Sequence, residues 1–345
     1  MANERSAILA GIKAALRLHR DLGVREQVEG AGGRVDVFGN VARLGATLMF
    51  QPLDKLLGAY LPADQQAEEA GVLVTTQRPL GVQRFTAAHE LGHLWMRHNP
   101  SLDDDGMLRR APFSSGARGV DLQEREADAF ASMYLVPSWM VALHMRQQEW
   151  TPADFADPRV MYQASLRFGA SYAATCYALE QHKVIGRNER ARLVEVEPKR
   201  IKQSLLPEGC KPASWRGDVW VLTERDEGRL IEGGREDLFV LRLREDSGAG
   251  YLWDFDRLAS AGFALLRDER ERVGGAGAVG GPVTRSVTAS APSAEDAEPG
   301  EVVLEERRPW MPRQPLAAYR LRYDLRGPER PGMWEPERRR LLQAA

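Results

Sequence analysis

Apolar residues follow a helical period over the first 190 residues or so and an alternating period after residue 215. Residues 3–30 place Ile8, Ile12 and Leu16 at helical spacing, which predicts one amphipathic helix. Gly30–Gly33 would end that helix. The change of period predicts an α+β region followed by a β region.

Short strands are predicted after the first helix. Val35–Phe38 and Ala46–Phe50 are short apolar runs, and Gly71–Thr76 (GVLVTT) is rich in β-branched residues, so we predict a strand at each. Leu56–Leu61, followed by Pro62, predicts a turn that leads into the last of these strands.

Two helices are predicted next. The first is Phe85–His98 (FTAAHELGHLWMRH), and the second lies within Leu122–Pro137 (LQEREADAFASMYLVP), whose apolar residues recur at helical spacing. Residues 99–121 between them contain the acidic run Asp103–Asp105 and predict a flexible surface loop. Residues 138–190 are expected to be helical.

Residues 160–185 have the pattern of two helices joined by a glycine turn. Gly169 interrupts the helical pattern, and Ser171 can cap a second helix over Tyr172–His182. This pattern fits either a DNA-binding helix-turn-helix or a helical subdomain of the preceding domain. The second helix has few side chains that read base edges, so we favour the subdomain and expect no direct nucleic-acid binding.

Beyond residue 215 short runs separated by turn residues predict an all-β sandwich. The expected strands are Val219–Thr223, Leu238–Arg244, Tyr251–Phe255, Phe263–Asp268, Val302–Glu306 and Tyr319–Leu325. Gly274–Gly300 is rich in Gly, Ala, Ser and Pro, and its second half, Ser286–Gly300, is expected to be disordered.

These patterns divide the chain into four predicted segments. They are an N-terminal domain with its helical subdomain over residues 1–190, a linker over 191–214, the β-sandwich over 215–326 and an Arg-rich surface tail over 327–345. The linker prediction depends on a mixed, charged composition with Pro and Gly near its end.

The composition is that of an ordinary soluble protein, with 345 residues, 43% hydrophobic and 28% charged. Its 47 basic and 49 acidic residues give a net charge of −2, which supplies no general attraction to nucleic acid or membrane. Two cysteines, Cys176 and Cys210, imply no disulfide framework, and no apolar run approaches the length of a membrane span. We therefore expect a cytoplasmic protein.

The run His89-Glu90-Leu91-Gly92-His93 is typical of a catalytic metal site. Residues four apart share a helix face, so His89 and His93 can bind one ion. Zn²⁺ suits two imidazole nitrogens, a third protein ligand and an open position for water, on which Glu90 can act as general base. The alternative is a chance occurrence on a core helix, but core helices rarely bury two histidines beside an unpaired glutamate.

The third ligand must come from another part of the chain. Glu124 and Asp128 share a helix face, so Glu124 can bind the metal while Asp128 accepts a hydrogen bond from a liganding histidine. Glu126 is expected to point elsewhere, about 200° round the helix from Glu124. His98, which we expect to turn away from the histidine pair, and His144 are the other candidate ligands.

The runs RFTAAHELGH and EREADAFASMYLVP resemble the ImmA/IrrE family of bacterial zinc metallopeptidases, over about residues 5–190. The resemblance implies an α+β zincin-like fold and assigns the third zinc ligand to Glu124. It also implies an endopeptidase that cleaves one specific protein, a transcriptional repressor, in stress response or mobile-element regulation. The strand at Gly71–Thr76 fits this fold, and we hypothesise that an extended peptide substrate adds to its edge.

The β region resembles the chagasin-like inhibitors of cysteine proteases over about residues 215–326. The motifs that match in order and spacing are Gly250-Tyr251-Leu252-Trp253, Gly280-Gly281 and Arg308-Pro309-Trp310. The resemblance implies an immunoglobulin-like sandwich with partner-binding residues Tyr251, Trp253, Arg308, Pro309 and Trp310. Asp246-Ser247-Gly248-Ala249 replaces the Asn-Pro-Thr-Thr element of that family, so weak or absent inhibition is expected. Trp253 and Trp310 could equally be core or loop-packing residues.

We therefore expect a cytoplasmic zinc metalloendopeptidase joined to a β-sandwich that docks a partner or regulates the enzyme. The partners would be a protein substrate and, at the sandwich loops, a papain-like protease or another protein. The alternative is a protein-binding regulator or cysteine protease inhibitor that acts through the sandwich and keeps a mainly structural zinc site. Glu90 favours the enzyme, because a structural site has no use for a general base.

Overall fold

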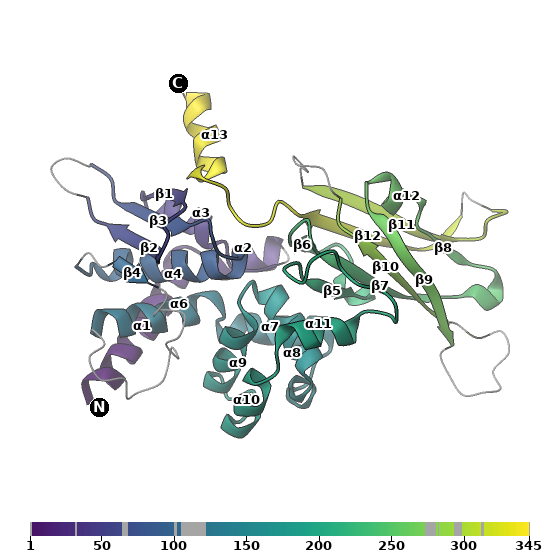
Figure 1. The fold of residues 1–345 in the computed structure, drawn as a ribbon, viewed down its shortest axis with the longest axis horizontal. Helices are drawn as coiled ribbons and strands as arrows, with labels where there is room; N and C mark the ends of the chain where they lie inside the picture. Colours follow the sequence, from purple (N-terminus) through teal and green to yellow (C-terminus); the bar gives the residue numbers. More distant parts are fainter. Residues whose placement is uncertain are drawn as a thin grey trace.

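The computed structural model describes residues 2–31, 33–63, 68–99, 102–104, 122–272, 281, 283–292, 299–311 and 314–344. Figure 1 shows an α+β region built around one sheet, a group of helices beside it and two further sheets at the opposite end. Most of the loop predicted at 99–121 lies outside the described residues. Among the described helices, none is both long and apolar enough to span a membrane.

The N-terminal helix is divided into α1 (Ala2–Asp21) and α2 (Val24–Ala31). The prediction of a single helix over 3–30 is wrong because Gly23 adopts φ +60°. This left-handed conformation, which glycine adopts at little cost, ends the first helix and lets the chain start a second one in a new direction.

The strand predicted at Val35–Phe38 is absent, and α3 (Val37–Arg43) begins there instead. The carboxylate of Asp36 accepts a hydrogen bond from the backbone N–H of Gly39 at 3.0 Å. This N-cap satisfies one of the donors that a helix leaves unpaired at its start. The apolar run that indicated a strand is therefore the buried face of a short helix, in which Val37, Phe38 and Val41 are buried.

One five-stranded sheet lies at the centre of the α+β region, in the order β13-β1-β3-β2-β4. Its strands are β1 (Thr47–Gln51), β2 (Leu56–Leu61), β3 (Gly71–Thr75), β4 (Leu102–Asp104) and β13 (Gly332–Met333). β1 and β3 are parallel, and the other neighbours are antiparallel. The strands predicted at Ala46–Phe50 and Gly71–Thr76 are confirmed, whereas the turn predicted at Leu56–Leu61 is strand β2. Four consecutive residues of β2 are buried, which hides the usual alternation.

β3 lies inside the sheet, paired with β1 on one side and β2 on the other. An extended peptide cannot add to its edge, so that hypothesis is wrong. The outer side of β2 pairs with β4, where Gly58 is opposite Asp103 and Ala59 is opposite Leu102. A segment of this chain therefore forms the strand next to β2.

Two helices carry the motif residues. α4 (Leu80–Met96) packs against β2 and β3, and α6 (Leu122–Leu135) packs against α4 and α1. α1 comes very close to α6 at Gly11, where a Cβ would lie 2.1 Å from the carbonyl oxygen of Glu126. α4 is thus the helix next to the sheet, with α6 and α1 behind it (Figure 1).

The helical region begins after Pro137. Its helices are α7 (Ser138–Gln148), η1 (Pro152–Ala156), α8 (Pro158–Phe168), α9 (Tyr172–Gln181), α10 (Arg187–Val194) and α11 (Pro198–Leu205). The predicted helix–glycine turn–helix is present, with Gly169 at φ +65° and the Ser171 hydroxyl accepting from the N–H of Ala174 at 3.2 Å. Half of the residues of α9 are buried, and its sequence contains no Lys or Arg, which fits a helical subdomain.

Half of the linker predicted at 191–214 is helical, since it contains the end of α10 and all of α11. The residues that these helices bury in the N-terminal core are Leu193, Ile201 and Leu205. Lys202 of α11 is anchored to the β region, donating to the carbonyl of Gly217 at 2.8 Å and pairing with Asp218 at 2.9 Å. The sequence analysis missed these helices because the composition is highly charged, although apolar residues such as Ile201 and Leu205 recur four apart between the charged ones.

The β region consists of two four-stranded sheets around one hydrophobic core. The first has the order β5-β7-β10-β9, with β5 (Val219–Leu222), β7 (Leu238–Glu245), β10 (Val283–Ser290) and β9 (Ala264–Arg272). The second has the order β6-β12-β11-β8, with β6 (Leu230–Glu232), β12 (Pro315–Asp324), β11 (Gly300–Arg307) and β8 (Leu252–Asp254). The connections contain η2 (Glu224–Asp226), η3 (Ser247–Ala249) and α12 (Asp256–Ser260). Each of the six predicted strands is present.

Strand β10 corrects the prediction of disorder, because Ser286–Ser290 belongs to it. This strand pairs with β7 on one side and β9 on the other. Val287 and Ala289 are 1% and 0% exposed, so the strand lies inside the sheet and contributes to the core. Its Ser, Thr and Ala residues resemble a polar loop by composition, and its pairing with two neighbouring strands is what marks it as a strand.

The C-terminal residues return to the N-terminal sheet. In β13, Gly332 and Met333 pair with Phe50 and Met49 of β1, and the N–H of Trp334 donates to the carbonyl of Leu48 at 3.0 Å. α13 (Glu335–Ala344) follows. The prediction of a surface tail over 327–345 is therefore wrong, and Figure 1 shows this segment crossing from the β region to the sheet of the α+β region.

Candidate metal centre

The two histidines and the glutamate of the motif lie on the buried side of α4. His89, Glu90 and His93 are each 0 or 1% exposed. α6 passes close to them because Gly92 has no side chain: a Cβ there would lie 3.1 Å from the ring of Phe130. This close approach brings the first turn of α6 next to the motif.

Three side chains bring their ligand atoms together between α4 and α6. The Nε2 atoms of His89 and His93 are 3.0 Å apart. The Glu124 carboxylate lies 3.4 Å from His89 Nε2 and 3.6 Å from His93 Nε2. Two ligands at about 2.1 Å from a tetrahedral ion are separated by about 3.4 Å, so this donor set fits one metal ion.

Asp128 lies behind His89, one turn after Glu124 on α6. Its Oδ1 is 3.1 Å from Nδ1 of His89, and the residue is 1% exposed. A carboxylate at this position favours the tautomer in which Nδ1 carries the proton and Nε2 is left to bind a cation. The structure thus brings Asp128 to the histidine it was predicted to support.

His98 and Glu126 correct the sequence analysis, which had both side chains pointing away from the motif. Nδ1 of His98 is 3.1 Å from Nδ1 of His93, and their rings meet edge to face with centroids 4.9 Å apart. Nε2 of His98 lies 2.9 Å from Oε2 of Glu126. Glu126 is therefore connected to His93 through the imidazole of His98.

The conformation of Arg97 explains why helical periodicity misplaces His98. α4 ends at Met96, and Arg97 has φ +57°, so the chain reverses direction. The N–H of His98 then donates to the carbonyl of His93 at 3.0 Å, and the His98 ring returns to α4. Non-glycine residues seldom adopt this conformation, so nothing local in the sequence marks the reversal.

His144 is not part of the donor cluster. Its Nε2 lies 3.1 Å from the carbonyl oxygen of Gly33, and its ring contacts that of Phe168 with centroids 5.3 Å apart. Burial lowers the pKa of His144 to about 4, so the ring is neutral at physiological pH. Among the described residues, the group that can hold a metal ion is His89, His93 and Glu124, with ligand atoms within 4.8 Å of one another.

Gly58 of β2 is a site residue that the sequence analysis assigned to a turn. A Cβ at this position would lie 2.7 Å from Oε1 of Glu90 and 2.4 Å from Cγ2 of Thr86. Only glycine lets β2 lie this close to the motif helix. The signal in the sequence is a glycine inside the apolar run LLGAYL, since glycine in a strand often marks a close approach.

Two predicted loop motifs meet in the β region. The guanidinium of Arg308 lies over the ring of Tyr251 at 4.5 Å, and its Nε donates to the carbonyl of Ala249 at 3.1 Å. The Trp310 ring packs on Gly250, where a Cβ would lie 2.6 Å from it, yet 67% of Trp310 is exposed. These residues form an aromatic cluster that solvent can reach.

Trp253 belongs to the core of the β region and is withdrawn as a partner-binding residue. It is 5% exposed, and its Nε1 donates to the carbonyl of Arg244 at 2.7 Å. Pro309 is exposed like Trp310, whereas Arg308 is partly buried. Gly281 is described, whereas Gly280 lies outside the described residues.

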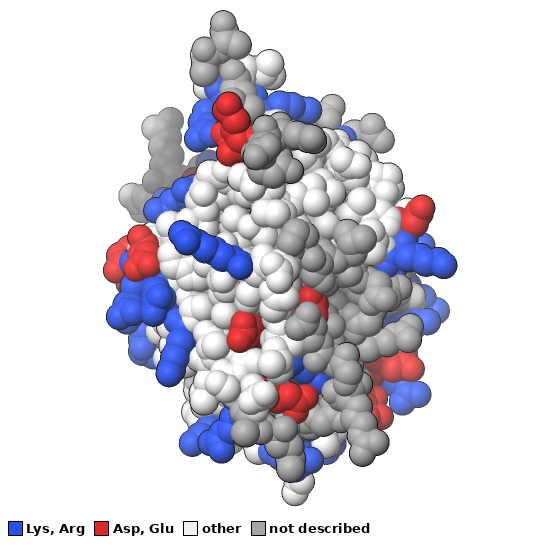
Figure 2. Space-filling view, turned by 90° about the vertical axis from the view of Figure 1, so that its left-hand side faces the viewer, with Lys and Arg blue, Asp and Glu red and all other residues white. Residues whose placement is uncertain are grey.

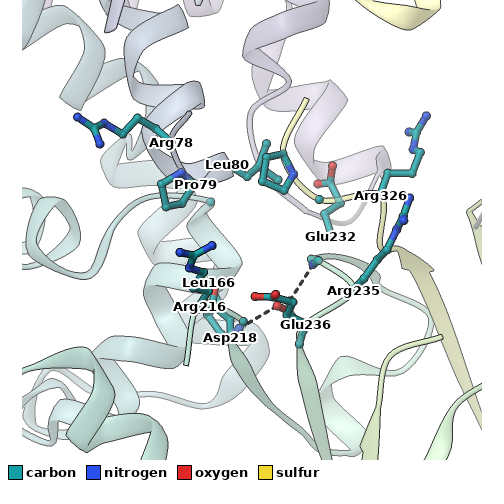
Figure 3. A pocket seen from close by; sticks show the side chains of 18 of the residues that line it. Arg78, Pro79, Leu80, Leu166, Arg216, Asp218, Glu232, Arg235, Glu236 and Arg326 are labelled. Carbon is teal, nitrogen blue, oxygen red and sulfur yellow. Dashed lines mark hydrogen bonds between the residues drawn. The ribbon is translucent and has the colours of Figure 1, made fainter. Parts of the chain in front are cut away.

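A cavity of about 870 Å³ lies where the α+β region, the helices and the β region meet (Figure 3). The segments that line it include 76–81, which leads into α4, 232–237 and 326–330. Two of its carboxylates are held by the protein itself: Glu232 pairs with Arg34 at 2.5 Å, and Asp237 accepts from Nε1 of Trp220 at 3.0 Å. The cavity reaches α4 only at its first turn and is separate from the metal centre.

Figure 2 shows the end of the molecule that the α+β region forms. Basic and acidic side chains are interspersed around the margin of this face, and uncharged residues occupy much of its middle. In the described part of this face the basic side chains do not form one continuous patch. This distribution agrees with the balanced net charge of the chain.

Residues 41–180 match the family model of the IrrE N-terminal-like domain, Peptidase_M78. No curated protein matches the chain. Among solved structures, the cysteine protease inhibitor EhICP2 from Entamoeba histolytica is 23% identical, with a TM-score of 0.27, over 32% of this chain and 96% of its own. Amebosin is 20% identical, with a TM-score of 0.26, over 31% of this chain and 97% of its own. The family match spans both α4 and α6, and residues 41–180 are therefore similar to an IrrE N-terminal-like domain, a domain of metallopeptidase type.

Proposed function

We propose that this protein is a zinc-dependent endopeptidase that cleaves a specific protein. The observation that carries the proposal is the cluster of three ligand atoms within 4.8 Å of one another, with Glu90 adjacent to one ligand on the same helix. Two imidazoles and one carboxylate are a donor set typical of zinc hydrolases that keep an open coordination position. The metallopeptidase-type family match supports the same activity.

Each residue of the site has a distinct role in this proposal. His89, His93 and Glu124 hold the ion, and bound zinc would acidify a water molecule and polarise the scissile carbonyl. Glu90 takes a proton from the attacking water and passes it to the leaving amine. Asp128 fixes the tautomer and orientation of His89.

We further propose that the substrate is a transcriptional repressor in stress response or mobile-element regulation, in the cytoplasm. This part follows from the resemblance of the two motifs to the ImmA/IrrE family. The β region, as an immunoglobulin-like sandwich, would dock the substrate through Tyr251, Arg308 and Trp310. Trp310 is exposed and Tyr251 and Arg308 are partly exposed, and aromatic and arginine side chains at loops are common interface anchors, which supports that assignment.

Mass spectrometry of candidate repressors incubated with the wild-type protein and with Glu90→Gln tests the proposal. Fragments that appear with wild type and are lost with the variant support a metallopeptidase with Glu90 as base. A chelator should abolish cleavage, and added Zn²⁺ should restore it where Mg²⁺ does not. Equal cleavage by both proteins would show that the activity does not depend on Glu90.

A further inference from the structure

We infer that His98 and Glu126 position the metal ligand His93, so that each histidine ligand is held by its own carboxylate. The inference rests on the proposed metal site and gives a role to two residues outside the donor set. Asp128 acts on His89 directly, whereas Glu126 acts on His93 through the imidazole of His98.

One consistent set of proton positions joins the three side chains. Binding a cation through Nε2 requires a lone pair there, so the proton of neutral His93 must be on Nδ1. That N–H faces Nδ1 of His98 at 3.1 Å, and it can donate only if this nitrogen carries a lone pair. The proton of His98 is then on Nε2, from which it donates to Oε2 of Glu126 at 2.9 Å.

Burial makes these hydrogen bonds effective in holding the ring. The side chain of His98 is 6% exposed and that of Glu126 is 24% exposed, so little water competes for them. The negative charge of Glu126 favours the proton on Nε2 of His98 and thereby keeps Nδ1 as the acceptor for His93. The edge-to-face contact of the two rings also limits rotation of the His93 imidazole.

The same contacts join the end of α4 to α6, so a purely structural role is the alternative. The chain contains a matched control for that role. The N–H of Asn99 donates to Oε1 of Gln123 at 2.8 Å, which ties the same turn to the same helix. Gln123→Ala removes that tie and leaves His93, His98 and Glu126 in place.

The experiment measures the Zn²⁺ affinity of full-length variants by competition with a chelator of known affinity. His98→Leu should weaken binding by about 10- to 100-fold, the usual effect of removing a group that orients a ligand. Glu126→Ala should weaken it less, and the double variant should bind no more weakly than His98→Leu alone, because both changes break one chain of hydrogen bonds. Gln123→Ala should leave the affinity unchanged.

Two further measurements separate positioning from structure. His98→Gln should recover part of the affinity, since its amide can accept from His93 and donate to Glu126. The visible absorption of bound Co²⁺, which reports ligand geometry, should change in His98→Leu and not in Gln123→Ala.

Wild-type affinity in both His98→Leu and Glu126→Ala would overturn the inference, and so would an equal loss in Gln123→Ala. If His98→Leu does not fold, Glu126→Ala and His98→Gln decide the question against the same control. A wild-type protein that binds no Zn²⁺ would instead contradict the proposed metal site itself, before any variant is compared.

Discussion

The side chain of Gln83 and the backbone of Glu329 form reciprocal hydrogen bonds. The N–H of Glu329 donates to Oε1 of Gln83 at 2.8 Å, and Nε2 of Gln83 donates to the carbonyl of Glu329 at 3.4 Å. The same Nε2 donates to the carbonyl of Thr75 at the end of β3, at 3.1 Å. The segment that leaves the β region is thus fastened to the first turns of the helix that carries the metal motif.

Gln83→Ala should destabilise the protein by about 1–3 kcal/mol, because it leaves buried backbone groups without partners. Gln83 is 0% exposed, so water does not replace the lost amide easily. Urea unfolding measures the effect, with Gln77→Ala, an exposed glutamine just before α4, as control. Equal stability of the two variants would show that the Gln83 contacts contribute little.

Stability should depend on pH through Glu329. Burial raises the pKa of this carboxyl to about 7, from an ordinary value of 4.5. Between pH 4.5 and pH 7 the Glu329 carboxyl is protonated more in the folded protein than in the unfolded chain. The stability that Glu329 contributes is therefore fully present below pH 4.5 and is lost as the pH rises toward 7.

Glu329→Gln should remove this contribution to the pH dependence. Urea unfolding gives the unfolding free energy of the wild type and of the variant between about pH 4.5 and pH 8. The difference between the two free energies should change with pH over this range. A constant difference over that range would contradict the prediction.

Deletion of residues 327–345 should destabilise the N-terminal region although all three metal ligands remain. The deletion removes β13 and opens the outer edge of β1, and open edges promote aggregation. Thermal unfolding and size-exclusion chromatography measure the two effects. Deletion of residues 335–345 alone, which keeps β13, is the control and should have the smaller effect.

Glu90→Gln should keep zinc and reduce peptide cleavage by about 10²-fold or more, since it removes the proton acceptor and preserves the size of the side chain.

Glu124→Ala should lose metal affinity, because it removes one of three protein ligands. Metal content after dialysis and cleavage rates distinguish the two variants. Full zinc occupancy in Glu124→Ala would contradict its role as ligand.

The two tryptophans of the β region should respond differently to truncation. Trp310→Ala should leave stability nearly unchanged and weaken cleavage of the native substrate, by about 2 kcal/mol if Trp310 is an interface anchor. Trp253→Ala should cost about 3–5 kcal/mol of stability, because this ring is in the core. Calorimetry and cleavage of folded substrate measure both, and an unstructured peptide serves as control substrate.

The possible metal donors, His89, His93 and Glu124, could be predicted from the sequence because the spacing within each helix is local. A 3.6-residue period places His89 and His93 on one face of α4, and it places Glu124 and Asp128 on one face of α6. The same period fails for His98, since the helix ends before it at a left-handed Arg97. Helical spacing describes only residues that remain in the helix.

The errors in the fold have a common origin in contacts between distant parts of the chain. Gly58 suggests a turn until Glu90 is brought against it, and Ser286–Ser290 suggests a loop until two strands enclose it. The two residues of β13 are defined as a strand only by their pairing with β1. Local propensity predicts the conformation of a segment poorly where a neighbouring strand or side chain, distant in the sequence, determines that conformation.

The position of β13 also affects the order in which the protein can be completed during its synthesis. A chain is made from its N-terminus, so β1 and the motif helix emerge long before Gly332–Met333 have been translated. Until then β1 has an open edge, and Gln83 lacks its partner at Glu329. A nascent or prematurely terminated chain therefore contains His89, His93 and Glu124 without the last strand of the sheet beneath them, and that sheet is finished only after the β region has been made.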